Sequence, residues 1–377
     1  MTYQHPLTPA LLDRSSAERL NYFKSITVPH QRLRQAVDSL LLNIQQPADI
    51  SVFFVVGPTG VGKTTLRLRA EKILSEASIS NMLACPCQIP VAGVEAIPAE
   101  RGNFSYKDYY LRVLESLNNI WINSILASKN PSFQIKELDQ SAYLQRKNSD
   151  VVRRALEKVM QHHQLMALMI DEAQHLLLMA GGRQMLQQMN WIKSIANVTG
   201  TVHILFGTYD LLNCCTLSGQ VSRRSDDIHL SRYSTHKQED IAEFIRIIQT
   251  FQMYLPLHEQ INLAQRYEYL MDYSIGCAGI LKTWLTKALR SALAEESKTL
   301  SWKHIQQNEY SPARRKQIRE EAEAGEKRWR NEVASQVGVE PELSNEVQDG
   351  TKSMTKKRRV GQRQPKRDSV GANSYVG

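Results

Sequence analysis

The feature that most constrains this chain is a glycine-rich loop that follows a short apolar run and precedes a helical pattern. The run "SVFFVV" covers residues 51–56 and is rich in β-branched and aromatic residues, which is typical of a buried strand. The next residues, "GPTGVGKT", place glycine at 57, 60 and 62, directly before Lys63 and Thr64. A strand, a loop of this spacing and a helix, in that order, predict a phosphate-binding loop.

Such a loop binds phosphate mainly through its backbone. Glycine lets the chain turn closely, so that N–H groups point at phosphate oxygens, and the positive end of the following helix adds to the attraction. Lys63 is expected to reach the β- and γ-phosphates of a nucleotide, and Thr64 to ligate Mg²⁺. The expected nucleotide-binding residues are Gly57, Pro58, Thr59, Gly60, Val61, Gly62, Lys63, Thr64 and Thr65.

Two adjacent carboxylates stand at the end of a second apolar run, "LMALMI" at residues 165–170. Asp171 is expected to hold Mg²⁺ together with the hydroxyl of Thr64. Glu172 is expected to polarise a water molecule for attack on the γ-phosphate, which favours hydrolysis over phosphate transfer to a small molecule. The alternative is that one of the two acids caps the helix predicted for "AQHLLLMAG".

Strand and helix patterns alternate along the first two thirds of the chain. Strands are predicted at 51–56, 87–93, 165–170, 201–207 and 227–230, and helices at 30–44, after the glycine loop, at 105–126 and at 148–164. This alternation indicates an α/β fold with a mostly parallel sheet. From about His236 the strand patterns stop, and helices are predicted at 237–251, 257–274, 280–297 and 301–310.

These patterns divide the chain into four parts. They are an N-terminal extension (1–30), a nucleotide-binding α/β domain (31–235), a small helical domain (236–310), and a charged, solvated helix followed by a flexible tail (311–377). The stretch from Thr351 to Asp368 holds eight basic residues and one acid, which is +7 of the chain's net +9. The folded body is therefore nearly neutral, and the tail is a basic arm.

Other features limit the class of protein. No run of 18 apolar residues is present, so we expect no transmembrane helix and no membrane partner. The N-terminus lacks a basic segment followed by an apolar one, so we expect no secretory signal. The five cysteines lack zinc-ligand spacing and are expected to be reduced thiols in a cytosolic protein. They are Cys85, Cys87, Cys214, Cys215 and Cys277.

Two polar residues stand where they can report the state of a nucleotide. Thr208 ends the run "HILFGT" and can reach the γ-phosphate or the attacking water, although an ordinary strand-end turn also explains it. Lys282 lies in the first turn of a helix that Gly276 and Gly279 open. It either senses the γ-phosphate from the helical domain or is a solvated helix lysine.

An arginine pair precedes the last short strand in "SGQVSRRSDDIHL". At a subunit edge, Arg223 or Arg224 can act as a finger on the nucleotide of a neighbouring copy. The alternative is a surface ion pair with Asp226 or Asp227.

Taken in order, the phosphate loop, "MIDEA", Thr208, the arginine pair and the helical domain resemble an AAA+ ATPase. More narrowly, residues 30–300 look like the TniB/TnsC family of transposition regulators. The resemblance rests on "FFVVGPTGVGKTTLRLR", "FSYKDYYLRVLESLN", "LMIDEAQHLLLMAGGRQMLQQMNWIKSIAN", "HILFGTYDLL" and "SRRSDDIHLSRY". The block from "DEAQHL" to "FGTYDLL" is its more family-specific part.

The resemblance implies an AAA+ P-loop fold with a helical lid, and ATP and Mg²⁺ as cofactors. Proteins of this family assemble with ATP as rings or helical filaments on duplex DNA, recruit a transposase, often with a target-site adaptor protein, and disassemble on hydrolysis. By motif match, Gly57–Thr65 bind ATP, Asp171 and Thr64 hold Mg²⁺, and Glu172 activates water. Thr208 matches the sensor, Arg223 or Arg224 the finger, and the position of Lys282 often holds arginine.

The family is bacterial, which implies a cytoplasmic, nucleoid-associated protein. Candidate DNA contacts are Arg101, Lys107, Arg183 and Lys193, although a solvated surface charge explains each of them at least as well. Because the body is nearly neutral, we expect ATP-driven assembly to multiply weak DNA contacts. The basic tail is expected to bind DNA or to dock on the transposase or adaptor.

Two other classes remain open. One is an AAA+ or STAND-like ATPase of secretion or signalling that does not act on DNA. The other is a nucleotide-gated scaffold with negligible turnover.

Overall fold

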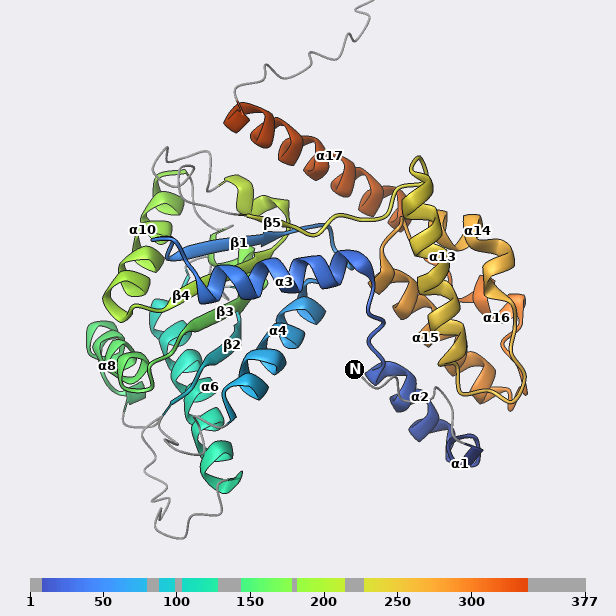
Figure 1. The fold of residues 1–377 in the computed structure, drawn as a ribbon, viewed down its shortest axis with the longest axis horizontal. Helices are drawn as coiled ribbons and strands as arrows, with labels where there is room; N and C mark the ends of the chain where they lie inside the picture. Colours follow the sequence, from blue (N-terminus) through green and yellow to red (C-terminus); the bar gives the residue numbers. More distant parts are fainter. Residues whose placement is uncertain are drawn as a thin grey trace, which may run out of the picture. The chain divides into compact units, whose positions relative to one another are not determined.

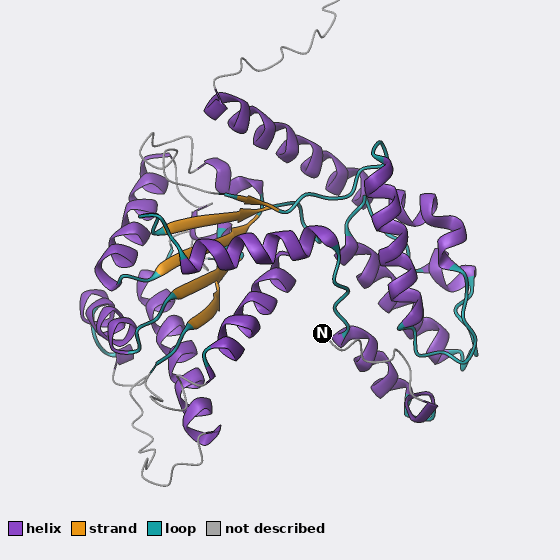
Figure 2. Cartoon of the chain, viewed as in Figure 1, coloured by secondary structure: helices purple, strands orange, loops and turns teal. Residues whose placement is uncertain are grey.

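The computed structural model describes residues 9–79, 88–98, 104–127, 144–177, 182–213 and 227–337. The chain forms two compact units, Met1–Val333 and Ala334–Gly377. Nearly all described residues belong to the first unit, which contains one sheet and a separate group of helices (Figures 1 and 2). None of the described helices is long and apolar enough to cross a membrane.

The sheet consists of five parallel strands in the order β2-β3-β4-β1-β5. They are β1 (Val52–Val56), β2 (Val91–Glu95), β3 (Ala167–Asp171), β4 (Val202–Gly207) and β5 (Ile228–His229). Every residue of β1, β3 and β4 is buried, because both faces of the sheet are covered. The predicted α/β class with a parallel sheet is confirmed.

Helices cover the two faces of this sheet (Figure 1). The helices are α3 (Gln31–Gln45), α4 (Lys63–Ala77), α6 (Tyr106–Ala127), α8 (Ser149–His162) and α10 (Gly182–Thr199). Side chains of β1 alternate between the faces. Phe53 and Val55 pack in one core with α3 and α4, whereas Phe54 and Val56 pack in the other core with α6, α8 and α10.

After β5 the described chain is helical, as predicted. The elements are α13 (Gln238–Met253), η2 (Leu263–Arg266), α14 (Tyr267–Tyr273), α15 (Ala278–Ala294) and α16 (Trp302–Gln307). The prediction of one helix over 257–274 is wrong, because helical structure begins only at Leu263. Just before it, the backbone N–H of Glu259 donates to the carbonyl of Lys298 at 3.0 Å, so this segment pairs with another loop.

The N-terminal segment packs into the core of the helical group. Helix α2 (Ser16–Ser25) begins with a capping box, in which Ser15 and Glu18 exchange hydrogen bonds between side chain and backbone. Phe23 is fully buried, and its ring lies 6.2 Å from that of Phe251 on α13. A short helix, α1 (Pro9–Leu12), precedes α2. Residues before β1 therefore contribute to two cores, α2 to the helical group and α3 to the sheet.

Helix α17 (Pro312–Val337) is the charged helix predicted from the sequence. Most of this helix is exposed, as a solvated helix should be, but one side contacts both the sheet and the helical group. The Trp329 ring stacks on His229, the last residue of β5, with centroids 4.9 Å apart. The guanidinium of Arg319 pairs with Asp272 at 2.8 Å. Gly325 lies so close to the ring of Tyr209 that a Cβ atom would overlap it.

Substitution of Gly325 by alanine tests this packing. In an exposed helix interior, Gly→Ala stabilises by about 1 kcal/mol. Here the new methyl group would collide with buried Tyr209, so we expect Gly325→Ala to lower the melting temperature and to speed amide exchange along α17. The exposed neighbour Ala324, changed to glycine, calibrates helix propensity alone. A rise in melting temperature for Gly325→Ala would show that α17 does not pack on Tyr209.

Candidate functional site

The parallel register brings the predicted chemical groups to one edge of the sheet. β1 pairs with β4 so that Val56 lies opposite Gly207, and β3 pairs with β4 so that Ile170 lies opposite Leu205. The glycine loop, the acid pair and Thr208 therefore all lie at the carboxyl ends of adjacent strands. In open parallel sheets, this is the edge at which ligands bind.

The glycine loop has the backbone of an anion site. Gly62 is the N-cap of α4 and has φ 115°, a conformation that L side chains rarely adopt, although its surroundings have room for one. No side chain caps the start of this 15-residue helix. Its first backbone N–H groups therefore remain available to phosphate oxygens.

Lys63 is buried inside the loop, with 7% of its surface exposed. Its ammonium donates to the carbonyls of Gly57 and Pro58 at 2.9 and 3.1 Å. Burial lowers the pKa of Lys63, and the charges of Glu172 and Asp171 oppose that shift. The lysine and the two carboxylates therefore act on one another electrostatically, although 108 and 109 positions separate them in the sequence.

Asp171 ends β3 and is 3% exposed. One carboxylate oxygen pairs with the Nε of Arg67 at 3.2 Å, and the other accepts the backbone N–H of Glu172 at 3.0 Å. Arg67 lies one turn after Thr64 on α4 and also pairs with Glu71. Burial raises the pKa of Glu71, and Arg67 opposes that rise. Arg67 thus joins the start of α4 to the end of β3.

Glu172 and Thr208 are connected through a buried glutamine. Gln174 begins the short helix α9 (Gln174–Leu177), and its amide donates to the carboxylate of Glu172. The same amide accepts the backbone N–H of Thr208 at 3.3 Å. Neither acid caps α9, since their hydrogen bonds go to Arg67, to Gln174 and to the backbone of Glu172 itself. The capping alternative is therefore wrong.

Thr208 lies between β4 and the turn η1 (Tyr209–Leu211). Its hydroxyl donates to Asp210 at 3.1 Å, and its carbonyl accepts the N–H of Leu211 at 3.1 Å. These contacts are those of a strand-end turn, located at the same sheet edge as the glycine loop. Its role as a sensor stays a prediction.

The start of α15 contacts the glycine loop. The N–H of Gly279 donates to the carbonyl of Gly60 at 3.0 Å. Lys282, one turn further, donates from Nζ to the carbonyls of Lys24 and Ile26 at the end of α2. The alternative of a solvated lysine is wrong, because the side chain is half-buried. A role at the γ-phosphate stays a prediction, and it requires those two bonds to break.

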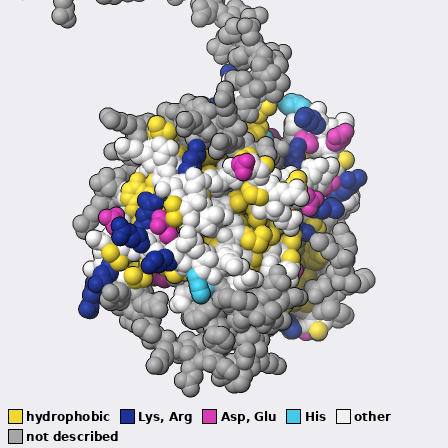
Figure 3. Space-filling view, turned by 60° about the vertical axis from the view of Figure 1, so that its left-hand side comes forward, with side chains coloured by type: hydrophobic (Ala, Val, Ile, Leu, Met, Phe, Trp, Pro, Cys, Tyr) yellow, Lys and Arg dark blue, Asp and Glu magenta, His cyan; other side chains and the backbone are white. Residues whose placement is uncertain are grey.

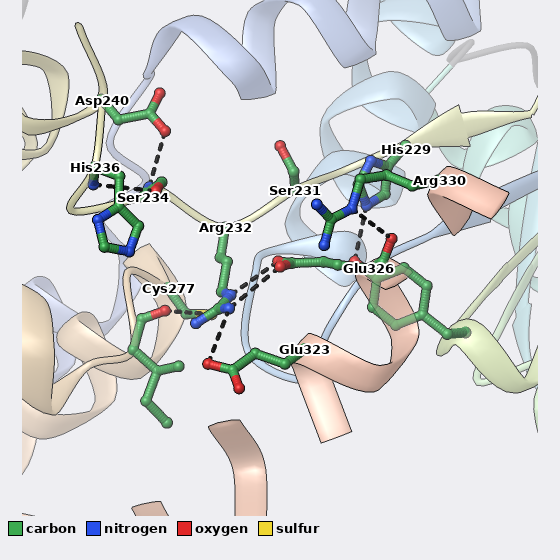
Figure 4. Close-up of polar contacts among 12 residues, drawn as sticks. His229, Ser231, Arg232, Ser234, His236, Asp240, Cys277, Glu323, Glu326 and Arg330 are labelled. Carbon is green, nitrogen blue, oxygen red and sulfur yellow. Dashed lines mark hydrogen bonds and ion pairs between the residues drawn. The ribbon is translucent and has the colours of Figure 1, made fainter. Parts of the chain in front are cut away.

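A residue that the sequence analysis missed connects the sheet to α17 (Figure 4). Arg232, three residues after His229, donates from Nε to Glu326 at 2.8 Å and lies 3.5 Å from Glu323. Burial opposes its charge, but the bonds and charge of Glu326 raise the pKa of Arg232 above its usual value. No local spacing signals this pair, because 94 positions separate its partners.

Several predicted residues lie outside the described part of the chain. They are Arg101, Arg223, Arg224 and four of the five cysteines; the side chain of Arg183 is not described either. The fifth cysteine, Cys277, is buried, and burial raises the pKa of its thiol to about 12. This agrees with an unreactive structural thiol.

The two remaining candidates for DNA contact, Lys107 and Lys193, are both half-buried. Lys107 donates to the carbonyl of Gln145. Over the face drawn in Figure 3, the coloured basic side chains of the described residues lie in small groups, with acidic and apolar ones among them. DNA contacts therefore stay a prediction.

The sheet order, the glycine loop after β1, the acid pair after β3 and the helical group after β5 define an AAA+ P-loop fold. Consistent with this, residues 49–214 match the family model of the AAA domain. This stretch holds the loop, the acid pair and Thr208. No curated protein matches the sequence.

Several solved structures are similar to this chain. The ORC2 protein of Aeropyrum pernix, in ADPNP and ADP complexes, has a TM-score of 0.50 at 16% identity, covering 77% of this chain and 72% of that one. The Walker-type ATPase paby2304 of Pyrococcus abyssi has a TM-score of 0.48 at 14% identity, covering 76% and 75%. Drosophila ORC bound to DNA has 0.48 at 14%, covering 82% and 68%. None of these matches singles out transposition regulators, so that resemblance stays a prediction.

Removal of Arg67 tests how Asp171 is held. Arg67→Met leaves buried Asp171 and half-buried Glu71 without their cation, and breaking a buried pair costs about 3 kcal/mol. We expect the free energy of unfolding, measured in denaturant, to fall by that order. Lys72→Met is the matched control, because Lys72 forms an exposed pair with Glu76 on the same helix, with side chains 74% and 59% exposed. Equal losses for both variants would contradict the role assigned to Arg67.

Proposed function

We propose that this protein is an ATP-hydrolysing regulator of DNA transposition that assembles on duplex DNA with ATP. The observation that carries the ATPase part is the convergence of Lys63, Asp171, Glu172 and Thr208 at one sheet edge. The transposition part rests on the sequence resemblance, above all the block from "DEAQHL" to "FGTYDLL".

The site fits a nucleotide triphosphate. The uncapped start of α4 and the buried ammonium of Lys63 both carry positive charge, which a bound anion compensates. The carbonyls of Gly57 and Pro58, which are neutral groups, accept the hydrogen bonds of the Lys63 ammonium. Phosphate oxygens would form stronger, charge-assisted bonds with the same ammonium. We therefore assign the β- and γ-phosphates of ATP to this loop.

The residues also fit Mg²⁺, although the described residues contain no cluster of three metal-ligating side chains. Mg²⁺ in such sites keeps several waters and takes most of its other ligands from phosphates, so one hydroxyl and one carboxylate suffice. Thr64 is exposed at the start of α4, and Asp171 has lone pairs beyond those that its two partners use. Thr64 and Asp171 would hold the ion, which would neutralise charge on the phosphates.

Hydrolysis then uses Glu172 as the base. Its carboxylate takes a proton from water, the water oxygen bonds to the γ-phosphorus, and the bond to the bridging oxygen of ADP breaks. Thr208 would orient the attacking water or the γ-phosphate. Arg223 or Arg224 of a neighbouring copy would stabilise charge on the transferred group, so turnover would depend on assembly.

The assembly would be a ring or a helical filament on DNA. In this proposal the ATP-bound form recruits a transposase and a target-site adaptor, and hydrolysis disassembles it. The basic tail would add DNA or partner contacts, and the protein would act in the bacterial cytoplasm. Electron microscopy with an ATP analogue and duplex DNA should show such assemblies. Dispersed monomers would contradict it, and an ATPase rate indifferent to DNA would favour an AAA+ ATPase of secretion or signalling.

Two substitutions separate binding from turnover. Lys63→Ala should abolish ATP binding, measured with a fluorescent nucleotide, because it removes the buried cation at the phosphates. Glu172→Gln should keep binding but lower the hydrolysis rate about 100-fold or more, because it removes the base. It should also prolong the lifetime of DNA-bound assemblies. Glu76→Gln, an exposed change on α4, is the control. An unchanged rate and lifetime in Glu172→Gln would favour a nucleotide-gated scaffold.

A further inference from the structure

Gln174 occupies a position between the predicted base and the predicted sensor. It is 6% exposed and lies two residues after Glu172. Its amide nitrogen donates to the carboxylate of Glu172, and its amide oxygen accepts the backbone N–H of Thr208 at 3.3 Å. A single side chain thus links the residue after β3 to the residue after β4.

The orientation of this amide is fixed by chemistry. A backbone N–H can only donate, so the atom of Gln174 that faces Thr208 must be the oxygen, and the NH₂ group must face Glu172. A glutamate in this position cannot make both bonds, because an ionised carboxylate has no donor. The two contacts therefore require an amide of this length.

The end of β4 packs closely against the side chain of Gln174. At Gly207 a Cβ atom would lie 2.5 Å from the amide oxygen of Gln174, so the last residue of β4 must be glycine for the amide to fit. The N–H of Ala173 donates to the carbonyl of Phe206 at 2.8 Å, which ties the start of α9 to β4. The amide is therefore held by the backbone N–H of Thr208 on one side and by the carboxylate of Glu172 on the other.

We propose that Gln174 is a positioning residue: it fixes the position of the Glu172 carboxylate relative to the backbone of Thr208. Glu172 is half-buried, has φ 50°, and has Gln174 as the side-chain partner of its carboxylate. A displacement of Thr208 toward a bound γ-phosphate moves its N–H, and the shared amide carries that movement to Glu172. This inference rests on the proposed ATPase function and assigns a regulator of its base.

The test compares Gln174→Met, which keeps the length and loses both bonds, with Gln188→Met, a second buried glutamine on α10. In nucleotide-free protein, Gln174→Met should speed exchange of the Thr208 amide, measured by NMR, at least ten-fold. With ATP it should lower kcat about ten-fold and leave KM within two-fold, and the effect of Thr208→Ala on kcat should be smaller in the Gln174→Met background. Gln188→Met should change none of these.

Each outcome bears on a different claim. Unchanged exchange at Thr208 overturns the bridge itself. Faster exchange with an unchanged kcat, in a protein that hydrolyses ATP, overturns the positioning role, as do fully additive effects of Gln174→Met and Thr208→Ala. Absence of hydrolysis in the unmodified protein overturns the proposed function together with the positioning role, while the exchange data still show whether the bridge exists.

Discussion

The parallel pairing of β4 with β1 on one side and β3 on the other is the constraint on which the site depends. It places three strand ends side by side, and the chain leaves each end with a different chemical group: an anion-binding loop, a pair of carboxylates and a hydroxyl. Side-chain bridges across these ends then hold the groups together. Arg67 connects α4 to Asp171, and Gln174 connects Glu172 to Thr208. The sheet thus brings the functional groups to one edge, and the two side-chain bridges fix their orientation relative to one another.

The helical group is joined to this edge at several points. The start of α15 bonds to Gly60 in the glycine loop, and Lys282 in the same helix holds the end of α2. Helix α17 reaches from Asp272 to the turn after Thr208, where Gly325 contacts Tyr209. The glycine loop therefore contacts α15 directly and is connected to the end of α2 through Lys282, whereas α17 contacts the neighbouring turn after Thr208. Helices α2 and α17, which lie before the glycine loop and after the helical group in the sequence, are thus both connected to this edge of the sheet.

Features encoded in local spacing could be predicted from the sequence. The loop, the strands and the acid pair are all recognisable within ten residues, because a phosphate loop and a buried strand each need a particular local pattern. The pairs Arg67–Asp171 and Arg232–Glu326 could not be predicted, since 104 and 94 positions separate their members and only the folded sheet brings them together. Gln174 lies in the motif "DEAQHL", only two positions from Glu172, but its bond to Thr208, 34 positions away, follows from the pairing of β3 with β4. The contacts of the helix over 311–333 could not be predicted either, because most of its contacting residues, such as Arg319 and Glu326, are charged and form no apolar stripe.

The central claim is that ATP hydrolysis at this edge depends on assembly along DNA. The most direct measurement is the ATPase rate per subunit over a wide range of protein concentration, with and without duplex DNA. If a neighbouring copy completes the site, the rate per subunit rises with concentration, and DNA moves that rise to lower concentration. A rate per subunit that is constant over the range and unaffected by DNA would contradict the account.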